Sequence, residues 1–126
     1  MQEKKKKIMV VEDNPMNKIL MKEVLTVNGY DVTEAGSGSE AIKKVSAEMP
    51  DLILMDLNLP EMDGITATKL LKANDACKAV PVIAITASAM KGEEEKILAE
   101  GFDGYISKPI EIKKFIKDVA AYIKKD

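Results

Sequence analysis

The chain has 126 residues, of which 46% are hydrophobic and 32% are charged, and its formal net charge is −2. This length and composition predict one globular domain, residues 1–126, that buries its own core without an attached output domain. The small net charge argues against nucleic acid or an anionic membrane as the partner, and the absence of histidine excludes Ser-His-Asp and Cys-His nucleophiles.

Short apolar runs alternate with segments of helical period, which is typical of βαβ units that build a parallel sheet. The first strand is predicted at residues 8–11. The next helix has Asn14 as its N-cap and Pro15 at its first helical position, and Gly29 ends it. Its apolar stripe is predicted to contain Met16, Leu20, Val24 and Val27.

The second and third strands are predicted at residues 31–35 and 52–55. Residues 36–39 form a plain turn between them, followed by a helix that Pro50 ends. The buried face of this helix is predicted to contain Ile42, Val45 and Met49. The third strand is apolar throughout, which favours a central parallel strand that is covered on both faces.

The second half of the chain repeats the alternation of helices and strands. A loop at residues 57–64, which contains Pro60, leads to a helix with Ala67, Leu70 and Leu71 on its inner face. The fourth strand is predicted at residues 82–85.

The last two helices flank the fifth strand. A charged helix with a thin apolar face is predicted at residues 93–99, and Gly101 ends it. The fifth strand is predicted at residues 104–107. The final helix has apolar residues at clean helical spacing: Ile112, Phe115, Ile116, Val119 and Ile123.

Two further observations concern location. Cys77 is the only cysteine, so no internal disulfide can form and a reducing compartment is indicated. No run approaches the roughly 20 apolar residues that span a bilayer, and no secretory signal is recognisable. We therefore expect a cytoplasmic protein without membrane association, in which the basic run at residues 4–7 is a solvated arm.

Polar residues stand directly after four of the five predicted strands. Glu12 and Asp13 follow the first, Asp56 the third, Thr86 the fourth and Lys108 the fifth. In an open parallel sheet these carboxyl ends share one edge, and ligands bind where the strand order reverses. The sequence therefore predicts that the five side chains converge on one site.

Three carboxylates in a partly desolvated crevice repel one another, so they must take up protons or recruit a cation. Mg²⁺ suits such a site because it needs only one or two carboxylates and completes its coordination with water and phosphate oxygens. Asp56 beside a metal can attack phosphorus to form an acyl phosphate. The Lys108 ammonium and the Thr86 hydroxyl can stabilise the phosphoryl oxygens.

Four motifs of the chain resemble those of the bacterial response-regulator receiver family. They are VVEDN, LILMDLNLPEMDG, ITA and YISKPI, and the resemblance covers nearly the whole chain. It implies a (βα)₅ flavodoxin-like fold, a doubly wound parallel sheet with strand order 2-1-3-4-5. Within the family, the chain resembles stand-alone cell-division regulators of the DivK type and the receivers attached to hybrid histidine kinases.

The resemblance also implies roles for single residues. Asp56 would be the phosphoacceptor, modified to 4-aspartylphosphate, and Thr86 and Lys108 would assist as catalytic residues. Glu12, Asp13, Asp56 and the Asn58 carbonyl would bind Mg²⁺, with Mn²⁺ as an alternative. Many members carry Asp where this chain has Glu12, which leaves open whether Glu12 reaches the metal directly or through water.

A conformational switch is implied as well. Thr86 would move toward the phosphoryl group and Tyr105 would turn inward, which requires that the phosphoryl group bind the inward state more tightly. The Lys108-Pro109 bond is expected to be cis. Asn58 and Ser88 would flank the phosphoryl group.

The implied partners are proteins. A histidine kinase or histidine phosphotransfer protein would supply the phosphoryl group, and a downstream protein would dock on the last two helices and the fifth strand. We expect a monomer that can dimerise on phosphorylation. It would catalyse only its own phosphorylation and dephosphorylation, so it would not be an enzyme in the ordinary sense.

Two other functions remain open at this stage. The first is a receiver-shaped adaptor that docks without phosphorylation, which the intact set of Asp56, Thr86 and Lys108 argues against. The second is a phosphohydrolase that uses Asp56 as its nucleophile. Such enzymes carry a second carboxylate two residues further on as general acid and base, where this chain has Asn58.

Overall fold

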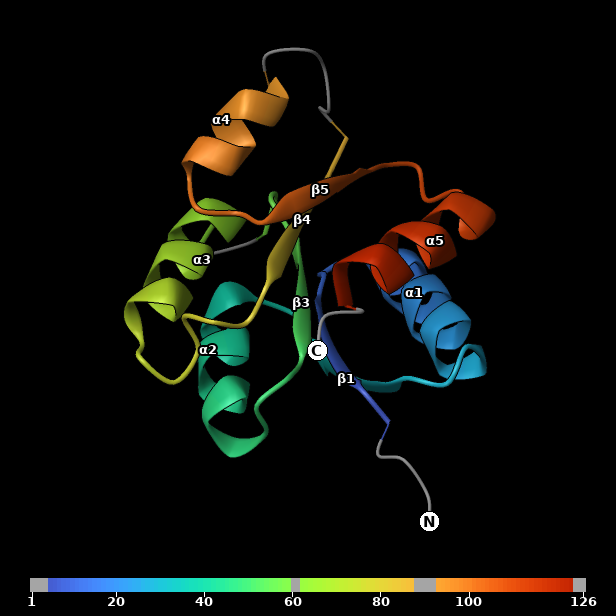
Figure 1. Ribbon diagram of the computed structural model, residues 1–126, viewed down its shortest axis with the longest axis horizontal. Coiled ribbons are helices and arrows are strands. Elements are labelled where there is room, and N and C mark those ends of the chain that lie inside the picture. Colours follow the sequence, from blue (N-terminus) through green and yellow to red (C-terminus); the bar gives the residue numbers. More distant parts are fainter. Residues whose placement is uncertain (1–4, 60–61, 88–92, 124–126) are drawn as a thin grey trace.

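A five-stranded parallel sheet forms the centre of the protein in the computed structural model, which describes residues 5–59, 62–87 and 93–123 (Figure 1). The strands lie in the order β2-β1-β3-β4-β5, which confirms the predicted doubly wound topology. Their bounds are β1 Lys7–Val11, β2 Asp31–Ala35, β3 Leu52–Asp56, β4 Val82–Thr86 and β5 Gly104–Ser107.

Two layers of helices cover the sheet. Helices α1 (Pro15–Val27) and α5 (Ile112–Ile123) lie on one face, and α2 (Gly38–Ala47), α3 (Gly64–Ala73) and α4 (Glu93–Ala99) lie on the other (Figure 1). Each layer encloses its own cluster of buried apolar side chains. The central strands β3 and β4 are buried at all five positions because both faces are covered, as the apolar run of β3 predicts for that strand.

Helix α1 begins as predicted but buries a different face. The Asn14 side chain accepts a hydrogen bond from the Asn17 amide, and Pro15 is the first helical residue. The predicted stripe is wrong at both of its ends, because Met16 is 76% exposed and Val27 is 84% exposed. The buried residues of α1 are Met21 and Leu25.

The reason is that α1 carries apolar residues around much of its circumference, so periodicity alone does not select a face. The sheet selects it, because Met21 and Leu25 project into the cluster that β1, β3 and α5 share.

The same kind of correction applies to three other helices. Val45 is buried in α2 as predicted, but Ile42 is half-buried and Met49 lies beyond the helix and is exposed. In α3 the predicted Leu70 is 49% exposed and Thr68 is buried instead. In α5 Phe115, Val119 and Ile123 are buried, Ile116 is half-buried and Ile112 is exposed.

The predictions for α4 and its surroundings are confirmed. Ile97 is the buried residue of α4, so its apolar face is thin. Gly101, with φ +106°, follows the helix in the left-handed conformation that favours glycine. The Lys108-Pro109 peptide bond is cis. Pro60 of the predicted loop lies outside the described residues.

No helix within the described ranges is long and apolar enough to cross a membrane.

Candidate functional site

The sheet brings the predicted polar residues to one edge. Asp56 and Thr86 are the last residues of β3 and β4, because each of these strands extends one residue further than predicted. Beyond the strands, main-chain hydrogen bonds continue the ladder: Glu12 N to Ala35 O at 3.0 Å, and Lys108 N to Thr86 O at 2.8 Å. Backbone pairing therefore fixes the Cα position of each of these residues at the edge of the sheet.

Three carboxylates form a cluster at this edge. One oxygen from each of Glu12, Asp13 and Asp56 lies within 4.8 Å of the other two. Glu12 and Asp56 are buried, whereas Asp13 is exposed at the rim of the cluster. Glu12 Oε1 is buried without a hydrogen-bond partner among the described residues. This set of hard oxygen donors fits a small divalent cation.

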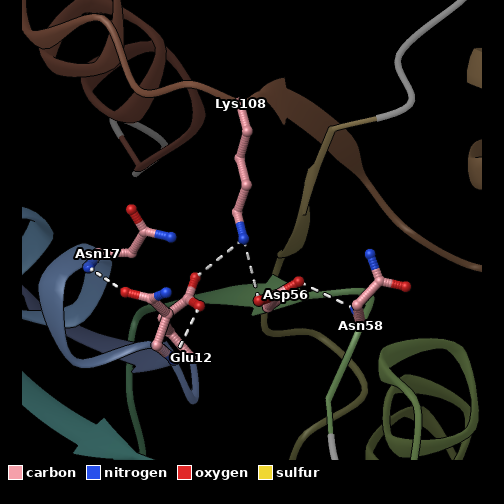
Figure 2. Close-up of polar contacts among 6 residues, drawn as sticks. Glu12, Asn17, Asp56, Asn58 and Lys108 are labelled. Atoms are coloured by element: carbon pink, nitrogen blue, oxygen red, sulfur yellow. Dashed lines mark hydrogen bonds and ion pairs between the residues drawn. The ribbon is translucent and has the colours of Figure 1, made fainter.

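Lys108 reaches into the cluster from the loop after β5 (Figure 2). Its Nζ donates a hydrogen bond to Asp56 Oδ2 at 3.1 Å and lies 3.4 Å from Glu12 Oε1. Burial by itself lowers the pKa of the Lys108 ammonium, but the hydrogen bond and charge of Asp56, with a contribution from Glu12, raise that pKa overall. Lys108 is therefore a firmly charged partner of both carboxylates.

Glu12 is the carboxyl most perturbed by this arrangement. Burial, followed by hydrogen bonding to Asp56 and the negative charge there, raises the pKa of Glu12 to about 7. The Asn14 amide, which donates to Glu12 Oε2 at 3.1 Å, and the Lys108 charge act in the opposite direction. The fold buries Glu12 among these charges, whereas Asp13 stays exposed.

The second oxygen of Asp56 has its own donor. The Asn58 amide donates to Asp56 Oδ1 at 2.9 Å (Figure 2). The resemblance gave Asn58 a carbonyl role toward the metal and a place beside the phosphoryl group, but it did not predict this bond. A signal for it exists, because an aspartate at the start of a turn commonly accepts from the backbone amide two residues further on. Both carboxylate oxygens of Asp56 are thus held.

Thr86 lies at the same edge of the sheet, and Tyr105 lies within β5, opposite Ala84. Thr86 is buried at the end of β4, opposite Ser107 of β5. Tyr105 of β5 is half-buried against the core on the α2, α3 and α4 side. Hydrogen bonding to Glu94 of α4, followed by burial, raises the pKa of the Tyr105 hydroxyl. Ser88 lies outside the described residues.

Comparison with known proteins gives consistent matches. Residues 8–120 match the family profile described as the response regulator receiver domain. The polar-differentiation response regulators DivK of Brucella anthropi and Brucella ovis are both 44% identical over 118 residues, which cover 94% of this chain and 96% of the relative.

Solved structures agree with these matches. The receiver domain of the sensor histidine kinase PA1611 from Pseudomonas aeruginosa, solved with a magnesium ion coordinated in its active site cleft, has a TM-score of 0.87 and 34% identity. The alignment covers 97% of this chain and 100% of the PA1611 receiver chain. A putative response regulator from Chloroflexus aurantiacus has a TM-score of 0.91 and 26% identity, with 97% and 100% coverage.

Proposed function

Because this chain belongs to the response regulator receiver family and is similar to DivK over nearly its whole length, we propose that it is a phosphorylation-dependent signalling protein with Asp56 as its phosphoacceptor. The observation that carries the proposal is the way Asp56 is held. Its two oxygens accept hydrogen bonds from Lys108 and from the Asn58 amide, beside two further carboxylates. This geometry orients a nucleophile next to groups suited to bind phosphoryl oxygens.

The reaction is a transfer from a phosphohistidine of a histidine kinase or phosphotransfer protein. A carboxylate oxygen of Asp56 attacks phosphorus, the P–N bond breaks, and its electron pair stays on the imidazole nitrogen. The Lys108 ammonium is placed to exchange its bond to Asp56 for one to the incoming phosphoryl group. The Thr86 hydroxyl, at the end of the adjacent strand, is a donor for another phosphoryl oxygen.

Mg²⁺, or Mn²⁺ in its place, would be held by Asp13, Asp56 and the Asn58 carbonyl, with Glu12 bound directly or through water. The bound ion supplies positive charge that offsets the carboxylates and the phosphoryl oxygens. Support comes from the oxygen donor cluster, in which Glu12 Oε1 faces the Lys108 ammonium at 3.4 Å but has no hydrogen-bond partner among the described residues. The magnesium ion in the similar PA1611 receiver agrees with this assignment.

Signalling would follow from a change in the surface formed by α4, β5 and α5. Tyr105 lies in β5 with its hydroxyl near Glu94 of α4, so a movement of Tyr105 would alter the contact between these two elements. We propose that a downstream protein docks there, that the unphosphorylated protein is monomeric, and that phosphorylation permits dimerisation.

Phosphorylation of Asp56 is tested by incubating the protein with acetyl phosphate and Mg²⁺ and measuring the intact mass. We expect an added mass of one phosphoryl group, stable in acid and labile in base, that is absent from Asp56→Asn. Asp75→Asn is the matched control, because Asp75 is a fully exposed aspartate outside the site. An adduct that persists in Asp56→Asn would refute the proposal.

A receiver-shaped adaptor would behave differently toward its partner. Equal affinity for a downstream partner with and without phosphorylation, measured by calorimetry on the same preparation, would favour the adaptor over the switch.

A further inference from the structure

The first residue of α3, Gly64, packs directly against the backbone of Asp56. A Cβ atom at Gly64 would overlap the Asp56 carbonyl oxygen, and would lie 2.9 Å from Leu57 Cα and 3.1 Å from the Asp56 carbonyl carbon. These atoms all belong to the main chain, so no side-chain rotation relieves the overlap. Only a residue without a side chain permits this approach.

The strand side of the contact is fixed. Asp56 pairs with Ile85 in the centre of the sheet, and the Leu57 amide donates to Ile85 O at 3.2 Å. Moving this backbone would break ladder hydrogen bonds in a buried sheet, where unpaired polar groups are costly. A side chain at Gly64 would therefore displace the start of α3 instead.

The start of α3 is tied in turn to the residues after Asp56. The Gly64 amide donates to Leu57 O at 3.1 Å, and Asp63 caps the helix by accepting from the Thr66 amide at 2.8 Å. Asn58, the next residue after Leu57, is the one whose amide holds Asp56 Oδ1. A displaced helix start would pull on Leu57 and disturb the Asn58 donor.

We propose that Gly64 is a positioning residue for the phosphoacceptor: its close approach to Asp56 closes the Leu57–Gly64 hydrogen bond and thereby holds the Asn58 amide on the Asp56 carboxylate. This inference rests on the proposed function, because it concerns the rate at which Asp56 reacts. Gly64 itself contacts only backbone atoms and no reacting group.

A role confined to helix formation predicts the opposite result. Alanine favours helix over glycine, so Gly64→Ala would stabilise α3 if the helix were all that mattered. The contact with Asp56 predicts instead that Gly64→Ala lowers both the melting temperature and the reactivity of Asp56.

The test compares Gly64→Ala with Ala67→Gly. Ala67 lies one turn further along α3 and is buried, so its replacement weakens the same helix without touching Asp56. Phosphorylation by acetyl phosphate with Mg²⁺ is followed below both melting temperatures. We expect Gly64→Ala to slow the reaction about 10- to 100-fold, the range for small misplacement of a reacting group. Ala67→Gly should leave the rate per folded molecule unchanged.

A specific signature comes from amide hydrogen exchange. In the wild type the Asn58 and Gly64 amides should be protected to a common extent, because both depend on the same closure. Gly64→Ala should expose the Asn58 amide and Ala67→Gly should not. If Gly64→Ala does not fold, the wild-type comparison still decides, since free exchange at Asn58 would overturn the inference.

The two proposals fail separately. A wild-type protein that is never phosphorylated refutes the proposed function. A wild-type protein that is phosphorylated at Asp56, with Gly64→Ala reacting at the same rate, refutes only the positioning role of Gly64.

Discussion

Glu12 illustrates how a single residue is set by its surroundings. Its side chain is buried beside Asp56, and one ammonium, that of Lys108, faces both carboxylates. One cation cannot offset two buried negative charges fully, so the carboxyl with less hydrogen bonding is the one that resists ionisation. A second cation bound at the site would offset the remaining repulsion between the two carboxylates.

Metal-free Glu12→Gln should therefore be more stable than the wild type at about pH 8. The pKa of Glu12 is raised from 4.5 to about 7, so its contribution to stability is present below the unfolded value and lost as the pH rises through about 7. The glutamine amide in Glu12→Gln is uncharged, like the protonated carboxyl of Glu12. Urea unfolding with a chelator present should show a gain on the order of 3 kcal/mol at about pH 8 that shrinks to roughly 1 kcal/mol at about pH 5 and vanishes at lower pH.

An exposed carboxyl serves as the control. Glu95→Gln on α4 should leave the pH dependence of unfolding unchanged. If Glu12→Gln and the wild type had parallel stability curves across this pH range, the burial and charge argument for Glu12 would be wrong.

Helix α1 shows how elements are placed by packing. It has two apolar sides, and the sheet covers the one that contains Met21 and Leu25. The other side leaves Met16, Ile19 and Val27 exposed. Their exposure does not affect the fold, because burial against β1, β3 and α5 supplies the stabilising contacts.

Two truncations in α1 separate its faces. Leu25→Ala removes a buried side chain and should lower the free energy of unfolding by about 2–5 kcal/mol. Val27→Ala should change it by no more than about 0.5 kcal/mol, because Val27 is 84% exposed. Equilibrium urea unfolding of both variants measures the difference. Similar losses of stability in the two variants would indicate that Val27 is buried, as the apolar stripe predicted from the sequence requires.

At the scale of the whole molecule, the site and the fold share their residues. Glu12, Asp56 and Thr86 are buried at the carboxyl ends of the central strands β1, β3 and β4. Charges concentrated there oppose folding, and a ligand that binds only the folded state opposes unfolding by mass action. Metal binding should therefore raise the free energy of unfolding of the whole domain.

Addition of Mg²⁺ should raise the free energy of unfolding, by about 2.7 kcal/mol when its concentration is 100 times the dissociation constant. Thermal unfolding with Mg²⁺ or with chelator measures the shift. Asp13→Asn, which removes an exposed member of the cluster, should fold normally and lose most of this increment. Asp31→Asn, at the exposed start of β2, is the control that should keep it.

An unchanged melting temperature on addition of Mg²⁺ to the wild type would contradict the metal site. An increment retained in Asp13→Asn would contradict only the assignment of Asp13.

The strands, the helices between them and the convergence of Glu12, Asp56, Thr86 and Lys108 could be predicted from the residues themselves, whereas the strand order followed from the resemblance to the receiver family. Strand and helix periods are local properties, and in a parallel sheet all carboxyl ends share one edge, so residues that follow strands must meet. The caps at Asn14 and Gly101 are equally local.

The tertiary structure decided which groups are buried and which atoms touch. The rotation of each helix against the sheet decides which of its faces is buried. It determines the buried face of α1 and the burial of Thr68 rather than Leu70 in α3. The packing of distant segments likewise buries Glu12 and leaves Asp13 exposed. The Gly64 contact with Asp56 depends on it too. Such rotations minimise the packing energy of distant segments together, and no local pattern of residues contains that information.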